Sequence, residues 1–290
     1  MTDPLVTFRL GLTGFPLGHS LSPVLQGAAL RSTGITGEYC LYPVPPFPEG
    51  QAAMRSLLDR LRSGELQGLN VTIPHKQNVI PLLDILTPAA SAIGAVNTIY
   101  RRGDRLVGDN TDAAGFFADL QRFVPFAGVP GGLEALVLGA GGSAHAVVYA
   151  LAQAGWRVCI AARRLEQASA LAASLSTGSA LISVLPLNAE AFSRQVSLVV
   201  NTTPLGMSPN IQASPWPDKG TFPARAFVYD LVYNPPETQL IREARAAGLR
   251  AANGLGMLVE QAILGFEIWT GRRPQRQALW QAVAPRQEII

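Results

Sequence analysis

The sequence predicts an α/β fold in two domains: an N-terminal α/β domain and a domain with a doubly wound sheet. Strand-like and helix-like segments alternate along the whole chain, which is typical of mainly parallel sheets. After residue 133 the alternation becomes regular. The 290 residues are 48% hydrophobic and 15% charged, so the chain is long and apolar enough to form sizeable cores.

Two kinds of pattern predict the elements of the N-terminal part. Short apolar runs bounded by Gly or Pro predict strands, and apolar residues at helical spacing predict helices. Ser22 is expected to cap the first helix, with Pro23 at its first helical position. Arg102-Gly103-Asp104 predicts a hairpin turn. The expected strands are 8–14, 38–44, 68–73, 95–100 and 105–107, and the expected helices are 22–31, 51–62 and 111–123.

The second part begins after a Pro- and Gly-rich stretch, 125–132, which predicts a loop. Apolar runs then alternate with helical segments in the βαβ pattern of a doubly wound domain. A last helix over 257–270 need not belong to that domain. The expected strands are 135–138, 157–161, 198–200 and 227–231, with helices after the first strand as far as residue 154 and over 165–175.

Charge and composition exclude several classes of protein. The formal charge is +3 and the basic residues are scattered, which indicates mild attraction for small anions and not a nucleic-acid interface. Cys159 lies in an apolar run, where a buried free thiol is expected, and no metal-ligand spacing occurs. No signal-peptide pattern or membrane-length apolar stretch is present, so we expect a cytoplasmic protein.

A glycine-rich motif after the strand at 135–138 predicts a nucleotide-binding turn. In Gly139-Ala140-Gly141-Gly142-Ser143-Ala144, the first glycine allows the sharp turn and Gly141 lets the backbone approach a diphosphate. Ala144 is small enough for helix–strand contact, and the following helix N-terminus offers N–H groups to phosphate. An ordinary βα turn is the alternative, but the βαβ context favours nucleotide binding.

The tip of the next strand predicts the cofactor. Turns that bind NAD usually have an acid about 20 residues further on, whereas an Arg accommodates the 2′-phosphate of NADP. Here Ala162-Arg163-Arg164 ends the strand, and no acid occurs before Glu166. Two solvated surface arginines are the alternative interpretation. We favour NADP, because guanidinium groups bind phosphate through paired, charge-assisted hydrogen bonds.

Two charged residues indicate proton transfer beside a redox cofactor. Interconversion of an alcohol and a ketone needs a group that stabilises the alkoxide and exchanges a proton, and the ammonium of Lys76 can do both. Asp112 could orient Lys76, bind a hydroxyl or share the proton. Each alone would be read as a surface Lys or a helix-start acid. Together with Asn70, Thr72 and Asn97 they predict a site for a polyhydroxylated ligand.

Further polar residues are less specific. Ser20 and Ser22 follow the first strand at a helix start, where they could hold a carboxylate or only cap the helix. His19 and His145 are expected to be structural or peripheral. His75 is adjacent to Lys76 but could equally be a solvated loop residue.

Eight collinear motifs extend over nearly the whole chain. They are Gly18-His19-Ser20-Leu21-Ser22-Pro23, Asn70-Val71-Thr72-Ile73-Pro74-His75-Lys76, Gly94-Ala95-Val96-Asn97-Thr98, Asn110-Thr111-Asp112-Ala113-Ala114-Gly115, Gly139-Ala140-Gly141-Gly142, Asn201-Thr202-Thr203-Pro204-Leu205-Gly206-Met207, Asp230-Leu231-Val232-Tyr233-Asn234-Pro235 and Gly256-Met257-Leu258-Val259-Glu260-Gln261. Together these motifs resemble those of the shikimate dehydrogenase family.

The resemblance implies reversible NADP-linked reduction of 3-dehydroshikimate to shikimate in the chorismate pathway to aromatic amino acids. It implies a substrate domain at 1–111 and 254–290 and a Rossmann NADP domain at 112–253, in a monomer or homodimer. By motif position, Lys76 and Asp112 are the catalytic pair. The other implied substrate contacts are Ser20 and Ser22 for the carboxylate, Asn70, Thr72, Asn97 and Gln261 for ring hydroxyls, and Tyr233 near the substrate. The implied cofactor contacts are Gly139, Ala140, Gly141, Gly142, Ser143, Ala162, Arg163, Arg164, Thr202, Met207, Leu231 and Gly254.

Two other functions stay open at this point. NADP-specific members of the family often have Asn-Arg-Thr where this chain has Ala162-Arg163-Arg164, so an amide on the adenine side is lost. A quinate/shikimate dehydrogenase with relaxed substrate or NAD use is one alternative. A non-catalytic ligand sensor on the same fold is the other, because fold does not fix function. Ser20 and Ser22, together with the lack of an acid between Ala162 and Glu166, favour the biosynthetic NADP-linked shikimate dehydrogenase.

Overall fold

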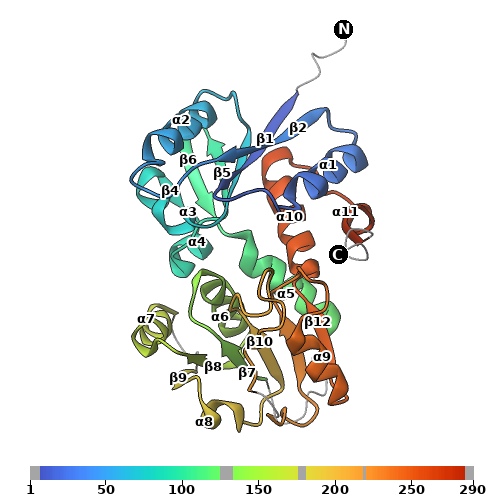
Figure 1. The fold of residues 1–290 in the computed structure, drawn as a ribbon. Coiled ribbons are helices and arrows are strands. Elements are labelled where there is room, and N and C mark those ends of the chain that lie inside the picture. Colours follow the sequence, from blue (N-terminus) through green and yellow to red (C-terminus); the bar gives the residue numbers. More distant parts are fainter. Residues whose placement is uncertain (1–6, 125–132, 176–180, 218–219, 285–290) are drawn as a thin grey trace. The chain divides into compact units, whose positions relative to one another are not determined.

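The computed structural model describes residues 7–124, 133–175, 181–217 and 220–284 (Figure 1). The loop predicted at 125–132 lies outside the described residues. The chain divides into two compact units. Among the described residues, the first unit contains those up to Thr111 and those from Val259 onward, and the second runs from Asp112 to Leu258. The helices α5 (Thr111–Phe123) and α10 (Leu255–Thr270) contain the two points of division.

The first unit is built on a mixed six-stranded sheet in the order β2-β1-β3-β5-β6-β4. Only β5 runs antiparallel to its neighbours, so its start lies at the edge where the other strands end. We call this the polar edge. The strands are β1 (Phe8–Gly14), β2 (Gly37–Pro43), β3 (Gly68–Val71), β4 (Ile85–Leu86), β5 (Thr98–Arg102) and β6 (Arg105–Asp109). The helices are α1 (Ser22–Thr33), α2 (Gln51–Arg62), α3 (His75–Asn78), the 3₁₀ turn η1 (Ile80–Leu82), α4 (Pro88–Ile93), α10 and α11 (Arg276–Val283).

The start of α1 differs from the prediction that Ser22 is its N-cap. Leu21 is the N-cap, with φ −82° and ψ −6°, and it makes no side-chain capping bond. Because Leu21 already has helical backbone angles, its carbonyl accepts from the N–H groups of Val24 and Leu25. Ser22 is therefore the first helical residue, and its own N–H donates to Ser20 Oγ at 3.2 Å. The hydroxyl of Ser22 has no capping role.

Side chains of α2 and α10 cover the sheet of the first unit. Leu58 and Leu61 of α2 pack into a buried cluster with Ile99 of β5. Trp269 of α10 donates from Nε1 to the carbonyl of Ile99 at 3.1 Å. A Cβ added to Gly68 would lie 2.3 Å from the Trp269 ring, so the close contact between α10 and β3 requires glycine there. This contact fixes the part of α10 that follows Gln261.

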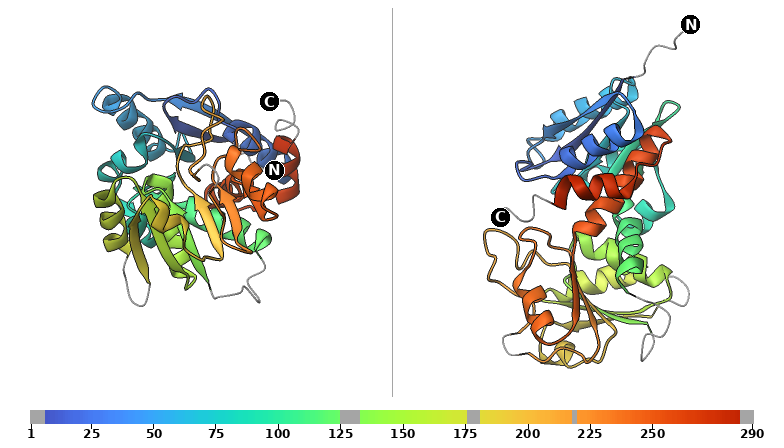
Figure 2. Two further views of the ribbon diagram at one scale, coloured as in Figure 1. Left: turned by 60° about the horizontal axis from the view of Figure 1, so that its bottom comes forward. Right: turned by 90° about the vertical axis from the view of Figure 1, so that its right-hand side faces the viewer.

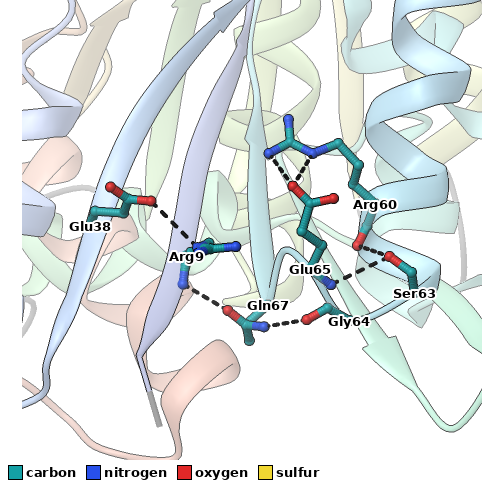
Figure 3. A network of polar contacts seen from close by, with 7 residues as sticks. All are labelled: Arg9, Glu38, Arg60, Ser63, Gly64, Glu65 and Gln67. Carbon is teal, nitrogen blue, oxygen red and sulfur yellow. Dashed lines mark hydrogen bonds and ion pairs between the residues drawn. The ribbon is translucent and has the colours of Figure 1, made fainter. Parts of the chain in front are cut away.

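A polar network closes the opposite edge of this sheet, where β1 and β3 begin (Figure 3). The backbone N–H of Arg9 donates to Gln67 Oε1 at 2.7 Å, and Gln67 Nε2 donates to the carbonyl of Gly64 at 2.6 Å. Arg60 forms an ion pair with Glu65 at 2.8 Å. These bonds satisfy groups at the N-terminal edge, so the polar edge defined above is a separate cluster.

The second unit contains six parallel strands in the order β12-β11-β10-β7-β8-β9. Counted along this unit, the order is the 3-2-1-4-5-6 arrangement of Rossmann domains, with a topological switch point between β7 and β10. Helices lie on both faces (Figure 2). The strands are β7 (Glu134–Leu138), β8 (Arg157–Ala162), β9 (Ile182–Pro186), β10 (Leu198–Asn201), β11 (Phe227–Asp230) and β12 (Arg250–Asn253), and the helices are α5, α6 (Gly142–Gln153), α7 (Leu165–Leu175), α8 (Ala189–Phe192) and α9 (Gln239–Ala246).

The predicted fold class is confirmed, since both sheets and the Rossmann strand order are present. Leu136, Val199 and Val228 are fully buried in the core of the second unit. Cys159 is a buried free cysteine and Cys40 is a half-buried one. Within the described ranges, no helix is both long enough and apolar enough to cross a membrane. The same residues contain no cluster of His, Cys, Asp or Glu suited to a metal ion.

Candidate functional site

The topology of the first unit brings most of the predicted substrate-binding residues to the polar edge. Each comes from a segment that enters or leaves a strand there, because parallel strands end at the same edge of a sheet. Asn70 lies near the end of β3 and Asn97 directly precedes β5. The segments are 20–22 after β1, 70–76 at the end of β3, residue 97 before β5, and residues 110–112 after β6.

Asparagine amides and threonine hydroxyls form a hydrogen-bonded network in the middle of this edge. Asn70 is 6% exposed and donates from Nδ2 to the carbonyl of Asn97 at 3.0 Å and to Thr98 Oγ1 at 3.2 Å. Thr98 Oγ1 donates to Asn97 Oδ1 at 2.9 Å. Asn97 Nδ2 donates to Thr111 Oγ1 at 2.9 Å, and the N–H of Thr111 donates to Asn97 Oδ1 at 2.8 Å. These bonds fix the end of β3, the start of β5 and the start of α5 to one another.

The network limits what Asn70 can offer a ligand. Both of its N–H donors are used within the protein, on Asn97 and Thr98. Its Oδ1 accepts from the Tyr39 hydroxyl at 2.7 Å and retains a second lone pair. Asn70 can therefore accept a hydrogen bond from a ligand hydroxyl while it holds the site together. Its predicted contact with a ring hydroxyl stays a prediction.

Tyr39 is a polar residue that the sequence interpretation missed, and its hydroxyl joins this network through Asn70. It lies on β2, and its ring contacts that of Trp269 with centroids 6.5 Å apart. Burial raises the pKa of the Tyr39 phenol far above its usual range, and a hydrogen bond with Ser22 lowers that pKa by a smaller amount. The phenol is therefore protonated and can donate to Asn70. A Tyr in the predicted strand 38–44 was the only signal for it.

The backbone of Lys76 is held from two sides. Lys76 is the second residue of α3, and its carbonyl accepts from the N–H of Val96 at 2.8 Å. The preceding His75 is fully buried, and its Nε2 lies 2.8 Å from the carbonyl of Val44. The alternative that His75 is a solvated loop residue is wrong: the turn after Pro74 directs its ring into the protein, against Phe47. The side chain of Lys76 itself is half-buried.

The remaining predicted substrate residues belong to helices and loops. Asp112 is the acid of the first turn of α5, directly after the anchored Thr111, and it falls in the second unit. Gln261 is 9% exposed on the part of α10 that belongs to the first unit. Tyr233 follows β11 in the second unit, and burial raises the pKa of its phenol. Thr72 is half-buried and its carbonyl accepts from His75 N–H at 2.9 Å.

The glycine-rich turn lies at the switch point of the second unit. Gly139 has φ +106°, a left-handed value that favours glycine, and a Cβ there would lie 2.8 Å from Thr202 Oγ1. Thr202 follows β10, and its hydroxyl donates to the carbonyl of Leu138 at 2.7 Å. The ends of β7 and β10 are thus joined at the point where Rossmann domains bind dinucleotides.

The turn has room and hydrogen-bond donors for a diphosphate. Gly141 is the N-cap of α6 and makes no side-chain capping bond. Among the residues that the structure describes, none beyond the turn and helix themselves has an atom within 4 Å of a Cβ added to Gly141 or Gly142, so these residues leave space beside this backbone. A helix N-terminus with a positive dipole end and uncapped N–H groups suits phosphate. Ser143 and Ala140 complete the turn.

The other predicted cofactor residues surround the same sheet edge. Ala162 ends β8, and Arg163 and Arg164 follow it as exposed side chains, as a 2′-phosphate site requires. Met207 is 48% exposed, which is unusual for a large apolar side chain. A Cβ on Gly254 would lie 2.1 Å from the carbonyl oxygen of Leu231, so these two backbones touch. The residues of this unit therefore fit NADP, in the loops around the switch point.

These observations define a class of two-domain protein that combines a Rossmann dinucleotide domain with a polar small-ligand unit. Comparison with known proteins specifies the family. The family model described as "Shikimate dehydrogenase substrate binding domain" matches residues 12–99, and that described as "Shikimate 5'-dehydrogenase C-terminal domain" matches residues 254–284. The shikimate dehydrogenase (NADP(+)) of Salinibacter ruber is 44% identical over 97% of this chain and 97% of its own length. The chain belongs to the shikimate dehydrogenase family, as the motifs predict.

Solved structures agree with this assignment. The shikimate 5-dehydrogenase from Thermus thermophilus, in complex with NADP(H) and shikimate, has a TM-score of 0.84 and 36% identity, with 96% of this chain and 99% of that chain covered. The quinate dehydrogenase from Corynebacterium glutamicum, in complex with NAD, has a TM-score of 0.86 and 29% identity, with 96% and 99% covered. A shikimate dehydrogenase with bound NADP(H) and a quinate dehydrogenase with bound NAD thus both have this fold.

Proposed function

We propose that this protein catalyses the reversible reduction of 3-dehydroshikimate to shikimate with NADPH, in chorismate and aromatic amino-acid biosynthesis. One observation carries the proposal. The hydroxyl, amide and ammonium groups at the polar edge occur in a chain that is 44% identical, over nearly its full length, to an NADP-linked shikimate dehydrogenase. The exposed Arg163 and Arg164, with no acid beside them, support NADP.

Reduction of the ketone needs a hydride on carbon and a proton on oxygen. NADPH supplies the hydride when it is bound. Lys76 is the proposed general acid: its ammonium hydrogen-bonds the carbonyl oxygen, stabilises the negative charge that develops there and transfers the proton to it. In the reverse direction the neutral amine accepts the proton from the alcohol. The fixed backbone of Lys76, bonded to Val96, limits the freedom of its side chain.

Asp112 is the proposed partner of Lys76. As a carboxylate in the first turn of α5, it can accept a hydrogen bond from the substrate hydroxyl and orient the ammonium group. Ser20 and Ser22 are proposed to bind the substrate carboxylate, because Ser20 Oγ already receives the Ser22 N–H and keeps its own proton to donate. Thr72, Asn97, Gln261 and Asn70 are proposed to contact the ring hydroxyls, with Tyr233 beside the ring.

The proposal also assigns one ligand to each unit and gives the cellular location and oligomeric state of the enzyme. The first unit would bind the substrate and the second would bind NADP. The protein would act on small molecules in the cytoplasm, as a monomer or homodimer. Size-exclusion chromatography with light scattering would decide between the two oligomeric states.

A side-by-side turnover assay tests this function. Purified protein is given shikimate or quinate with NADP⁺ or NAD⁺, and formation of the reduced cofactor is followed by its absorbance. The proposed function predicts the highest kcat/KM for shikimate with NADP⁺. Faster turnover of quinate with NAD⁺ would support the alternative that the fold of the Corynebacterium glutamicum enzyme suggests. Ligand binding without turnover in any combination would identify a sensor.

A further inference from the structure

A buried carboxylate connects three segments of the second unit. Asp230 is the last residue of β11, and it is fully buried, with 0% exposure. Its Oδ1 accepts from Asn201 Nδ2 at 2.8 Å and from the N–H of Val232 at 3.0 Å. Its Oδ2 accepts from Thr238 Oγ1 at 2.6 Å. The end of β10, the segment after β11 and the start of α9 are thus bonded to one side chain.

Asn201 extends this connection along the segment 201–207. Its Oδ1 accepts from the N–H of Thr203 at 2.9 Å and from Thr203 Oγ1 at 2.7 Å. Its Nδ2 also donates to the carbonyl of Leu205 at 3.3 Å. A Cβ on Gly206 would lie 3.3 Å from Thr238 Cβ, so the same segment packs on the residue that caps α9. The fold of 201–207 therefore depends on the Asn201–Asp230 pair.

The position of these segments indicates which half of the cofactor they meet. A Rossmann domain has two mononucleotide-binding halves, one on each side of the switch point. The half formed by β7, β8 and β9 contains the glycine-rich turn and the two arginines, which suit the diphosphate and the adenosine 2′-phosphate. The segments 201–207 and 231–238 follow β10 and β11, which belong to the other half of the domain. We therefore expect these segments to contact the nicotinamide half of the cofactor. They contain Met207, Leu231 and Tyr233.

We propose that Asp230 is a positioning residue for the nicotinamide half of the cofactor. It does not touch the reacting atoms. It holds the two segments in one conformation, so that their groups need no ordering when the cofactor binds. When a binding surface is ordered for only part of the time, the measured affinity equals the affinity of the ordered state multiplied by the fraction of molecules that are ordered. This inference rests on the proposed function, because it takes NADP as the ligand.

Thr238 offers a matched pair of variants. Thr238→Val removes the hydroxyl that donates to Asp230 and keeps the shape that packs on Gly206, whereas Thr238→Ser keeps the hydroxyl. Dissociation constants are measured by calorimetry for NADP⁺ and for adenosine 2′,5′-bisphosphate, which has the adenine-side phosphates but no nicotinamide. We expect Thr238→Val to weaken NADP⁺ by about 5- to 50-fold and to change the bisphosphate less than twofold. Thr238→Ser should behave as wild type for both.

A second variant extends the test to the carboxylate. Asp230→Ala removes all three hydrogen bonds to the carboxylate, and we expect a larger loss of NADP⁺ affinity with the bisphosphate again unchanged. If this variant does not fold, the Thr238 pair alone decides. Equal weakening of both ligands in Thr238→Val, or no weakening of either, would overturn the positioning role. A wild-type protein that binds the bisphosphate but neither binds NADP⁺ nor oxidises shikimate would instead overturn the proposed function.

Discussion

Gly256→Ala should destabilise the protein, although alanine is the better helix former. Gly256 is the second residue of α10, and a Cβ there would lie 2.0 Å from Asp119 Oδ2 and 2.1 Å from Oδ1. Asp119 is 9% exposed on α5 and accepts from the Tyr229 hydroxyl at 2.8 Å. The added methyl group therefore occupies the place of a buried, hydrogen-bonded carboxylate.

The size of the effect follows from two opposing contributions. Ordinary contact between a methyl carbon and another heavy atom needs about 3.5 Å, so the carboxylate of Asp119 must move by more than 1 Å, roughly. That movement breaks the hydrogen bond from Tyr229 to this buried side chain, which costs about 1–3 kcal/mol. Replacing Gly by Ala in a helix returns about 1 kcal/mol. Taking the middle of the first range, we expect a net loss of about 1 kcal/mol in the free energy of unfolding.

Gly265→Ala on the same helix is the control. Its Cβ would meet Trp269 at 3.6 Å, which is ordinary contact, so we expect no loss of stability or a gain of up to about 1 kcal/mol. The assay is equilibrium unfolding in urea, followed by circular dichroism. Asp119→Ala completes a double-mutant cycle, in which the penalty of Gly256→Ala should disappear once the carboxylate is absent. A Gly256→Ala protein as stable as wild type would refute the steric reasoning.

Three further variants test the site and its charges. Lys76→Ala should lower kcat by about 10²- to 10⁴-fold with a small change in KM, as expected for loss of a general acid, and full turnover in this variant would exclude that role. Replacing Arg163 and Arg164 by Ala should raise the KM for NADP⁺ and leave that for NAD⁺ unchanged, whereas equal changes would contradict the 2′-phosphate assignment. Burial raises the pKa of Asp230 from 3.8 to about 6, so its contribution to stability is present below pH 3.8 and is lost as the pH rises through 6. The free energy of unfolding of the wild type should therefore fall by about 2 kcal/mol relative to Asp230→Asn between pH 4 and pH 7 in urea unfolding, and parallel pH profiles would contradict this.

Elements with strong apolar periodicity were predictable from the sequence, and those set by tertiary contacts were not. The helices at 51–62 and 165–175 occur with the predicted bounds. The strand Arg250–Asn253 was missed, because Ala and Asn have low strand propensity and pairing with β11 holds it. The strand Ile182–Pro186 was also missed. It is a partly exposed edge strand that ends at Pro, so the sequence pattern for a strand is weak there.

The same division applies to the candidate site. Residue type and chain position were enough to predict the glycine-rich turn and to group Asn70 with Asn97. The structure brings the two asparagines together because the antiparallel strand β5 begins at the edge where β3 ends. The partners of each polar group could not be read from the sequence. The donation from Tyr39 to Asn70 connects residues 31 positions apart, and Asp230 is recognisable as a junction only when three segments meet on it.

The most direct test of the proposed chemistry is the initial rate at which the purified protein oxidises NADPH in the presence of 3-dehydroshikimate. We predict rapid loss of NADPH absorbance that depends on 3-dehydroshikimate, and a rate lower by orders of magnitude in Lys76→Ala at the same protein concentration. No loss of absorbance with the wild-type protein, or an equal rate in the variant, would contradict the assignment of this chain as an NADPH-linked dehydrogenase with Lys76 as its acid.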